Sequence, residues 1–253
     1  MRADVQPTGD VSNPQAVQHE YYTKTAATYD EMRGGDEWAL HFAESLLLGV
    51  VVYIEAESLL DVGAGTGRTI AFLKSKWPKL RFVGIEPVAA LRRIAVERRK
   101  LAEEEIVAGD GANLPFSDGS FDLVVALGVL HHVPQPSRVV HEMLRVSRKG
   151  VFICDVNHVG QGNWVARRVK GLLRRSGLWP IINVLRTGGK GYYVSDGDGL
   201  AYSYSVFENL AQIEQAGFRV HLMNMGGHGV QPFYDSPGAV VIALRERSHC
   251  TGV

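Results

Sequence analysis

The chain has 253 residues, of which 45% are hydrophobic and 21% charged, and its 27 Lys and Arg balance its 27 Asp and Glu. This composition is that of a globular protein and excludes a disordered chain. Zero net charge provides no field that attracts nucleic acid, so we expect no nucleic-acid partner. We expect one domain over residues 1–253, because α/β folds commonly reach this length.

No targeting or membrane-spanning segment is expected. The opening stretch MRADVQPTGDVSNPQ has no apolar core of the kind that secretion signals carry. The longest apolar run, Leu46 to Ile54, is too short to cross a bilayer. Cys154 and Cys250 alone cannot form a disulfide framework. These features predict a cytoplasmic protein.

Residues 1–53 predict a polar tail followed by helices, with an interruption near Arg33-Gly34-Gly35. Over residues 54–155, apolar runs then alternate with amphipathic segments. The runs are SLLDVG, RFVGIE, EEIVAGD, FDLVVALG and GVFICDVN. Such strands, separated by helices, predict a parallel sheet covered on both faces.

Two later helices carry terminal signals. PSRVVHEMLRVSRKG predicts a helix with Ser137 as N-cap and Gly150 just beyond its end. Residues 205–253 begin with SVFENLAQIEQAG, in which Ser205 and Glu208 form a capping-box pattern. The runs RVHLMNM and GAVVIALRE follow with only a loop between them, so they predict an antiparallel hairpin.

The stretch LLDVGAGTGRT places Gly63, Gly65 and Gly67 after an apolar run. The dinucleotide pattern G-x-G-x-x-G fails because Arg68 occupies its last position, and no Lys-Ser/Thr pair completes a P-loop. Asp61 would repel a pyrophosphate but could pair with an ammonium group. The loop therefore predicts a ligand with a cationic amino-acid end; a tight turn without a ligand is the alternative.

This loop resembles the [DE]-x-G-x-G-x-G motif of class I S-adenosylmethionine-dependent methyltransferases. The longer stretch GDGANLPFSDGSFDLVVALGVLHHVPQP resembles the group that includes quinone-biosynthesis C-methyltransferases and many small-molecule O-methyltransferases. The resemblance covers residues 20–155 well, 156–200 loosely and 201–245 in pattern only. It implies a seven-stranded, mostly parallel Rossmann-like sheet with the last strand antiparallel. It also implies S-adenosylmethionine as cofactor, S-adenosylhomocysteine as product and a small-molecule acceptor.

The resemblance also assigns cofactor contacts. Glu86 would hold the ribose hydroxyls and Asp110 the adenine amino group, although a capping carboxylate and a turn aspartate are the alternatives. The segment YYTKTAATYDEM resembles the family's N-terminal lid, whose tyrosines could equally be core aromatics. The implied cofactor-binding residues are Asp61, Gly63, Ala64, Gly65, Gly67, Glu86, Pro87, Asp110, Gly111, Ala112, Leu127, Tyr22 and Tyr29.

His131 and His132 follow the fourth predicted strand. In related O-methyltransferases a histidine of this motif acts as general base, which implies that role for His132, with His131 orienting or packing beside it. The alternative is a pair that only bonds backbone groups. His131, His132, Asp155 and His158 could gather at one edge, but the acidic pattern of magnesium-dependent relatives is absent. We therefore expect no metal.

Residues 156–204 form the predicted acceptor-side cap. Between residues 156 and 194 there are seven Lys and Arg and no Asp or Glu. This pattern predicts an amphipathic basic helix that holds an acidic acceptor, rests on a membrane, or is a solvated face beside a dimer contact. Asn157, Tyr202 and Tyr204 are the candidate acceptor contacts, together with His132.

The sequence thus predicts methyl transfer to a small molecule, with O-methylation favoured by the candidate base. C-methylation of a quinone or lipid-like precursor is the first alternative, and a non-catalytic cofactor-binding module is the second. Either a monomer or a homodimer fits the sequence.

Overall fold

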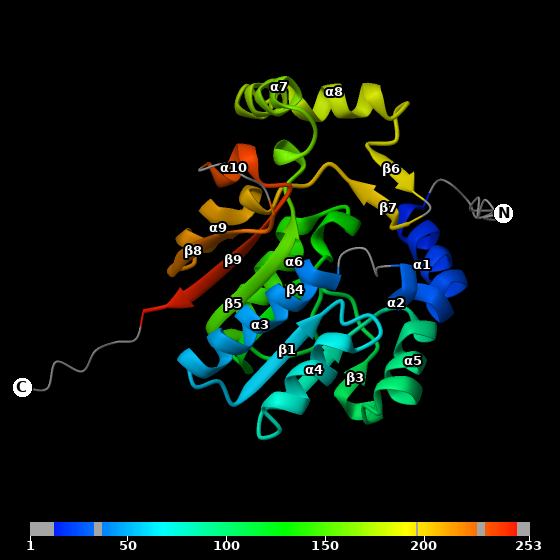
Figure 1. Ribbon diagram of the computed structural model, residues 1–253, viewed down its shortest axis with the longest axis vertical. Coiled ribbons are helices and arrows are strands. Elements are labelled where there is room, and N and C mark those ends of the chain that lie inside the picture. Colours follow the sequence, from blue (N-terminus) through cyan, green and yellow to red (C-terminus); the bar gives the residue numbers. More distant parts are fainter. Residues whose placement is uncertain (1–12, 33–36, 196, 227–230, 247–253) are drawn as a thin grey trace, which may run out of the picture.

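A seven-stranded sheet lies at the centre of the structure, a computed structural model that describes residues 13–32, 37–195, 197–226 and 231–246 (Figure 1). Its strand order is β3-β2-β1-β4-β5-β9-β8. The strands are β1 (Ser58–Val62), β2 (Arg81–Ile85), β3 (Ile106–Val107), β4 (Phe121–Leu127), β5 (Ser147–Val156), β8 (Phe218–Asn224) and β9 (Gly238–Arg245). A separate hairpin pairs β6 (Tyr192–Ser195) with β7 (Gly199–Tyr202).

Strands β1 to β5 are parallel, as predicted. All five residues of β1 are buried, in accord with a strand covered on both faces. Strand β9 runs antiparallel to both β5 and β8, which confirms the predicted closing hairpin. The carboxyl ends of the parallel strands therefore share one edge of the sheet, where α/β proteins bind ligands.

Helices cover both faces of this sheet (Figure 1). Helices α3, α4 and α5 pack on one face around Leu47, Ile70 and Ala95, whereas α6 and α9 pack on the other around Val140 and Ile213. The helices are α1 (Pro14–Thr25), α2 (Tyr29–Met32), α3 (Glu37–Tyr53), α4 (Arg68–Lys76), α5 (Ala89–Arg99), α6 (Pro136–Val146), α7 (Trp164–Arg175), α8 (Trp179–Arg186), α9 (Leu210–Gln215) and α10 (Pro232–Asp235).

The predicted ends of α6 are wrong. Gln135 is its N-cap and Pro136 its first residue, because the fixed φ of proline suits that position; Ser137 lies inside the helix. The helix ends at Val146 and passes directly into β5, so Gly150 is a strand residue. A Cβ on Gly150 would lie 2.8 Å from the Leu244 side chain, which explains the glycine by strand packing.

The segments outside the two layers form the lid and the cap. The lid consists of α1, a short 3-10 turn and α2; the predicted interruption at residues 33–35 lies outside the described residues. In the cap, the single predicted basic helix is two helices, α7 and α8, separated by Ser176–Leu178. The β6–β7 hairpin then returns the chain to α1, where Val17 packs against Tyr192 and Leu200.

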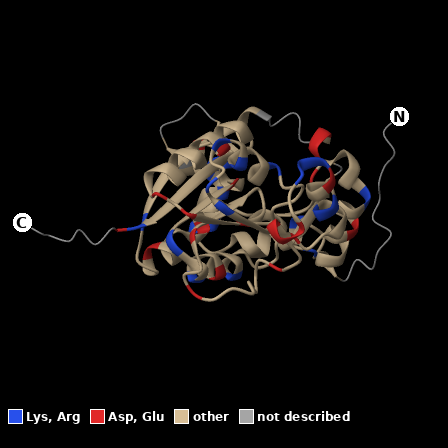
Figure 2. Ribbon diagram, turned by 90° about the horizontal axis from the view of Figure 1, so that it is seen from below, with Lys and Arg blue, Asp and Glu red and all other residues tan. Residues whose placement is uncertain are grey.

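Charged residues of both signs are interspersed over the described ribbon (Figure 2). This distribution accords with the zero net charge of the chain. Most ion pairs involve exposed side chains, which contribute little to stability. The charges that bear on function are the buried ones at the carboxyl edge of the sheet.

Candidate active site

The glycine loop joins β1 to α4 at this edge. Gly63, Gly65 and Gly67 all have positive φ, at 74°, 56° and 71°. A Cβ on Gly63 would lie 2.6 Å from a methyl carbon of Val129, so that position excludes any larger side chain. The loop therefore takes a left-handed path that brings its backbone close to the strand ends.

Two buried carboxylates flank the loop. Glu86 accepts hydrogen bonds from Gly65 N at 3.0 Å and Val88 N at 2.8 Å, and burial raises its pKa. Burial, reinforced by the negative charges of Glu44 and Glu86, raises the pKa of Asp61 to about 7. Among the described residues, no donor contacts the Asp61 carboxylate. A ligand ammonium would supply the missing partner, so these residues fit an amino-acid end.

A first cavity of about 320 Å³ opens beside this loop. It takes in most of the predicted cofactor residues, and it adds three that the sequence did not single out on α1: Gln15, Gln18 and His19. The predicted residues that line it are Gly63, Gly65, Glu86, Pro87, Asp110, Leu127, Tyr22, Tyr29 and His132.

The other predicted cofactor residues do not line the first cavity but lie close behind the residues that do. Asp61 is 3% exposed, and Ala64 and Gly67 belong to the same loop. Ala112 N donates to Asp110 Oδ1 at 2.9 Å, so the aspartate also stabilises its own turn. Gly111 lies where a Cβ would meet Val62 at 2.7 Å. Their contacts with a cofactor remain predictions.

The histidine pair lies on a 3-10 turn, Leu130–His132, directly after β4. His131 Nδ1 donates to Asp155 Oδ1 at 2.6 Å, and its Nε2 lies 3.1 Å from Asp198 Oδ2. Burial alone would lower the pKa of His131, but attraction to Asp155 and hydrogen bonds to both carboxylates raise it to about 9. His131 is therefore an imidazolium that bridges two carboxylates at neutral pH.

His132, in contrast, is neutral. Its Nδ1 lies 2.6 Å from the Leu200 carbonyl oxygen, which can only accept, so Nδ1 carries the proton. Burial and the adjacent His131 charge lower the pKa of His132. Its Nε2 lone pair accepts from the Tyr22 hydroxyl at 3.0 Å and lies 3.4 Å from Asp198 Oδ1. His132 is thus a neutral imidazole with Nε2 facing the first cavity.

A second cavity of about 570 Å³ lies next to the first, and Leu127 and Gly128 line both. His131, Asp155 and Asp198 line this second cavity. Its remaining lining is mainly apolar: Met32, Ala39, Leu40, Cys154, Val156, Met225, Pro237 and Gly238, with Arg68, Gln161 and Gly197. The histidine segment therefore separates two chambers.

Asp198 is a further site residue that the sequence did not predict. It lies in the β6–β7 turn, within the segment GYYVSDGDGLAYSYS, of which only Tyr202 and Tyr204 were predicted acceptor contacts. The acidic residues of this segment stand out in an otherwise basic cap, and this contrast could have indicated a functional carboxylate. Burial would raise the pKa of Asp198, but the hydrogen bond from His131 holds it below its usual range.

Three ligand-type residues could also hold a metal. His131, His132 and Asp198 offer atoms that all lie within 4.8 Å of one another. With His131 doubly protonated, however, the contacts of this group are those of a hydrogen-bonded proton network. His158, considered with them from the sequence, lies elsewhere: its ring centroid is 5.2 Å from that of Trp179, and burial lowers its pKa to about 3.

His132 lines the first cavity, but the other predicted acceptor contacts line neither cavity. Asn157 is fully buried, and its side-chain amide donates to the carbonyls of Phe233 and Ser236 at 2.8 Å. The Tyr204 hydroxyl donates to Asn209 Oδ1 at 2.8 Å within the core. Tyr202 packs against Tyr192. Their contact with an acceptor stays a prediction.

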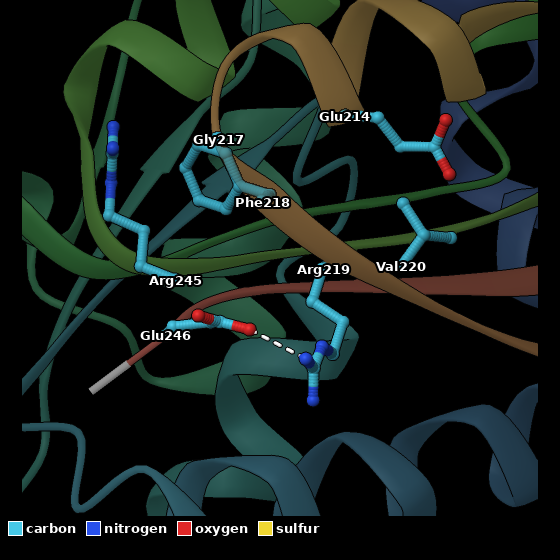
Figure 3. A pocket seen from close by; sticks show the side chains of 7 residues that line it. All are labelled: Glu214, Gly217, Phe218, Arg219, Val220, Arg245 and Glu246. Atoms are coloured by element: carbon cyan, nitrogen blue, oxygen red, sulfur yellow. Dashed lines mark ion pairs between the residues drawn. The ribbon is translucent and has the colours of Figure 1, made fainter. Parts of the chain in front are cut away.

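A third hollow lies at the opposite end of the strands (Figure 3). Phe218, at the start of β8, and Arg245, at the end of β9, line it. Arg219 and Glu246 form an ion pair of 2.6 Å across it, with side chains 66% and 69% exposed. Exposed pairs contribute little, and this hollow is remote from the carboxyl edge, so it adds no site.

Comparisons with known proteins agree with this geometry. Residues 60–154 match the family described as "Methyltransferase domain". The structure of magnesium protoporphyrin IX methyltransferase from Synechocystis, with bound S-adenosylhomocysteine, superposes with a TM-score of 0.60 at 15% identity, over 92% of this chain and 100% of that one. Residues 60–154 thus carry a methyltransferase domain, and the chain has the fold of class I S-adenosylmethionine-dependent methyltransferases.

Curated relatives match only part of this chain. The rice 2-methyl-6-phytyl-1,4-hydroquinone methyltransferase 2, chloroplastic, is 28% identical over 169 residues, 62% of this chain and 47% of the relative. The demethylmenaquinone methyltransferase of Thermotoga maritima is 34% identical over 105 residues, 41% of this chain and 45% of the relative. The chain thus spans about half the length of these relatives. No helix among the described residues is long and apolar enough to span a membrane.

Proposed function

We propose that this methyltransferase transfers the methyl group of S-adenosylmethionine to a small-molecule acceptor. The cofactor binds in the first cavity and the acceptor in the second. One observation carries this proposal: the two cavities meet at Leu127 and Gly128, beside a neutral histidine. Bound S-adenosylmethionine would supply an activated methyl group, so the protein's task is alignment and proton removal.

His132 is the base in this proposal, and the favoured reaction is O-methylation. His132 and Tyr22 line the first cavity, so the acceptor hydroxyl must reach past Leu127 and Gly128 from the second cavity; there it displaces the Tyr22 hydroxyl and donates to His132 Nε2. The bound cofactor would supply the methyl group to the acceptor oxygen, and His132 Nε2 would take the proton that this oxygen loses. Asp198 Oδ1, 3.4 Å from Nε2, stabilises the imidazolium that results.

C-methylation of a quinone-like precursor is the alternative supported by the relatives' names. A phytyl hydroquinone and a demethylmenaquinone are both aromatic rings that carry an apolar chain. Removal of a ring hydroxyl proton by His132 would equally activate a ring carbon. A non-catalytic cofactor-binding module is the remaining alternative; the oriented, neutral Nε2 argues against it.

A methyl-transfer screen with labelled S-adenosylmethionine tests the proposal. Phenol, hydroquinone and sugar acceptors are compared for the wild type, His132→Gln and, as a surface control, His141→Gln. We expect His132→Gln to lower kcat by about 10² to 10⁴ with product affinity retained, and His141→Gln to have no effect. Equal turnover in His132→Gln would refute the base, whereas no product from any acceptor would refute the activity.

A further inference from the structure

The cap helices turn large apolar side chains toward solvent, unlike an ordinary amphipathic helix at a protein surface. Lys170, on α7, is buried, and its Nζ donates to the carbonyls of His158 and Gln161. Arg174, one turn later, contacts Glu208 and the Ser203 carbonyl. A surface helix normally turns its charged side to water and its apolar side to the protein. On α7, Lys170 and Arg174 face inward, whereas large apolar side chains face outward.

That outward side is extensively apolar. Leu172 and Leu185 are 67% and 74% exposed, and Trp164 is 68% exposed. Eight of the 18 exposed large hydrophobic residues in the described part of the chain lie on or between α7 and α8: Trp164, Val165, Val169, Leu172, Leu178, Ile181, Val184 and Leu185. Both helices lie at one end of the molecule, at the top of Figure 1. Exposed apolar side chains gathered on two neighbouring helices are typical of an interaction surface.

The charged residues of the segment that carries this face are all of one sign. Residues 156–194 contain seven Lys and Arg and no Asp or Glu. Arg168 and Arg175 lie at the edge of α7, with their guanidinium carbons 4.6 and 5.8 Å from the Tyr234 ring centroid. An apolar centre with a basic border matches the interface of an anionic bilayer. A second copy would instead oppose like charges across a two-fold interface.

We propose that the α7–α8 face docks on an anionic lipid bilayer, with both helices lying in the interface. Three residues that line the second cavity flank the helices of the cap: Gln161 precedes α7, and Gly197 and Asp198 lie in the β6–β7 turn that follows α8. Docking of the cap would thus bring this part of the cavity wall toward the lipid. Resting on the proposed function, this assigns the acceptor to lipid-like molecules with an apolar chain.

Vesicle co-sedimentation tests the docking surface. The full chain is mixed with phosphatidylcholine vesicles, with or without phosphatidylserine. We expect binding to the anionic vesicles, weakened by salt. The double variant Leu172→Gln/Leu185→Gln should bind at least tenfold more weakly, because burial of one leucine side chain corresponds to about a factor of ten. Leu222→Gln, a leucine 43% exposed on β8, is the matched control and should bind as the wild type does.

Quenching by brominated lipid tests the contact directly. Tryptophan emission should fall on the vesicles and the fall should be lost in Trp164→Phe. Failure of the wild type to bind, or equal binding by the double variant and the control, would overturn docking. So would a dimer in sedimentation that the double variant converts to a monomer. S-adenosylhomocysteine binding, measured in parallel, separates the two proposals: its retention without vesicle binding overturns docking alone.

Discussion

The pH dependence of cofactor binding follows from the state of Asp61. Burial and two neighbouring carboxylates raise its pKa to about 7. The Asp61 carboxyl is therefore partly protonated at a pH near neutrality. In our proposal the cofactor ammonium pairs with the ionised form only. A carboxylic acid with a pKa of about 7 is about one-tenth ionised at pH 6 and nine-tenths ionised at pH 8.

Affinity for S-adenosylhomocysteine should therefore rise about tenfold from pH 6 to pH 8, which is about 1.4 kcal/mol. Calorimetry at each pH measures the affinity, and a change of buffer reveals the proton released on binding. Asp61→Asn should bind more weakly and lose most of the pH slope. A slope of wild-type size in Asp61→Asn would refute this reasoning, as would pH-independent binding by the wild type.

Three further outcomes are expected. Gly63→Ala should lower the free energy of unfolding by about 2–4 kcal/mol and weaken cofactor binding, because the new Cβ would clash with Val129. The control Gly119→Ala should cost less, because Gly119 has a similar φ but open space around it. The free energy of unfolding should fall from about pH 6.5 to pH 9, because the charged His131, whose pKa is raised, stabilises the fold only while it stays protonated. In urea titrations at each pH, His131→Gln should show a smaller fall. Chelator treatment should leave methyl transfer unchanged, since protons complete the histidine network; loss of activity restored by a divalent cation would contradict this.

Local motifs predicted which residues lie together at the carboxyl edge of the sheet on the proposed cofactor side. Asp61, Gly63 and Glu86 each end a strand or begin a turn, so their mutual geometry follows from the order of parallel strands. The ends of α6 were wrong because Pro136, rather than Ser137, sets its first turn. Gly150 was misassigned because sheet packing, which is non-local, extends β5 through it.

The acceptor side depends on contacts between distant segments. Asp198 reaches the histidines only because the β6–β7 hairpin folds back onto α1, which no local pattern encodes. The side of α7 that faces the protein could not be predicted either. Its sequence reveals an apolar and a basic side, but only the contacts of Lys170 and Arg174 show which side faces the protein.

A crystal structure with S-adenosylhomocysteine bound tests the two-cavity account most directly. The account predicts the ammonium beside Asp61, the adenosine between Glu86 and Asp110, and the sulfur at Leu127, facing His132 and the second cavity. A product bound in the second cavity, or a sulfur directed away from His132, would contradict the account.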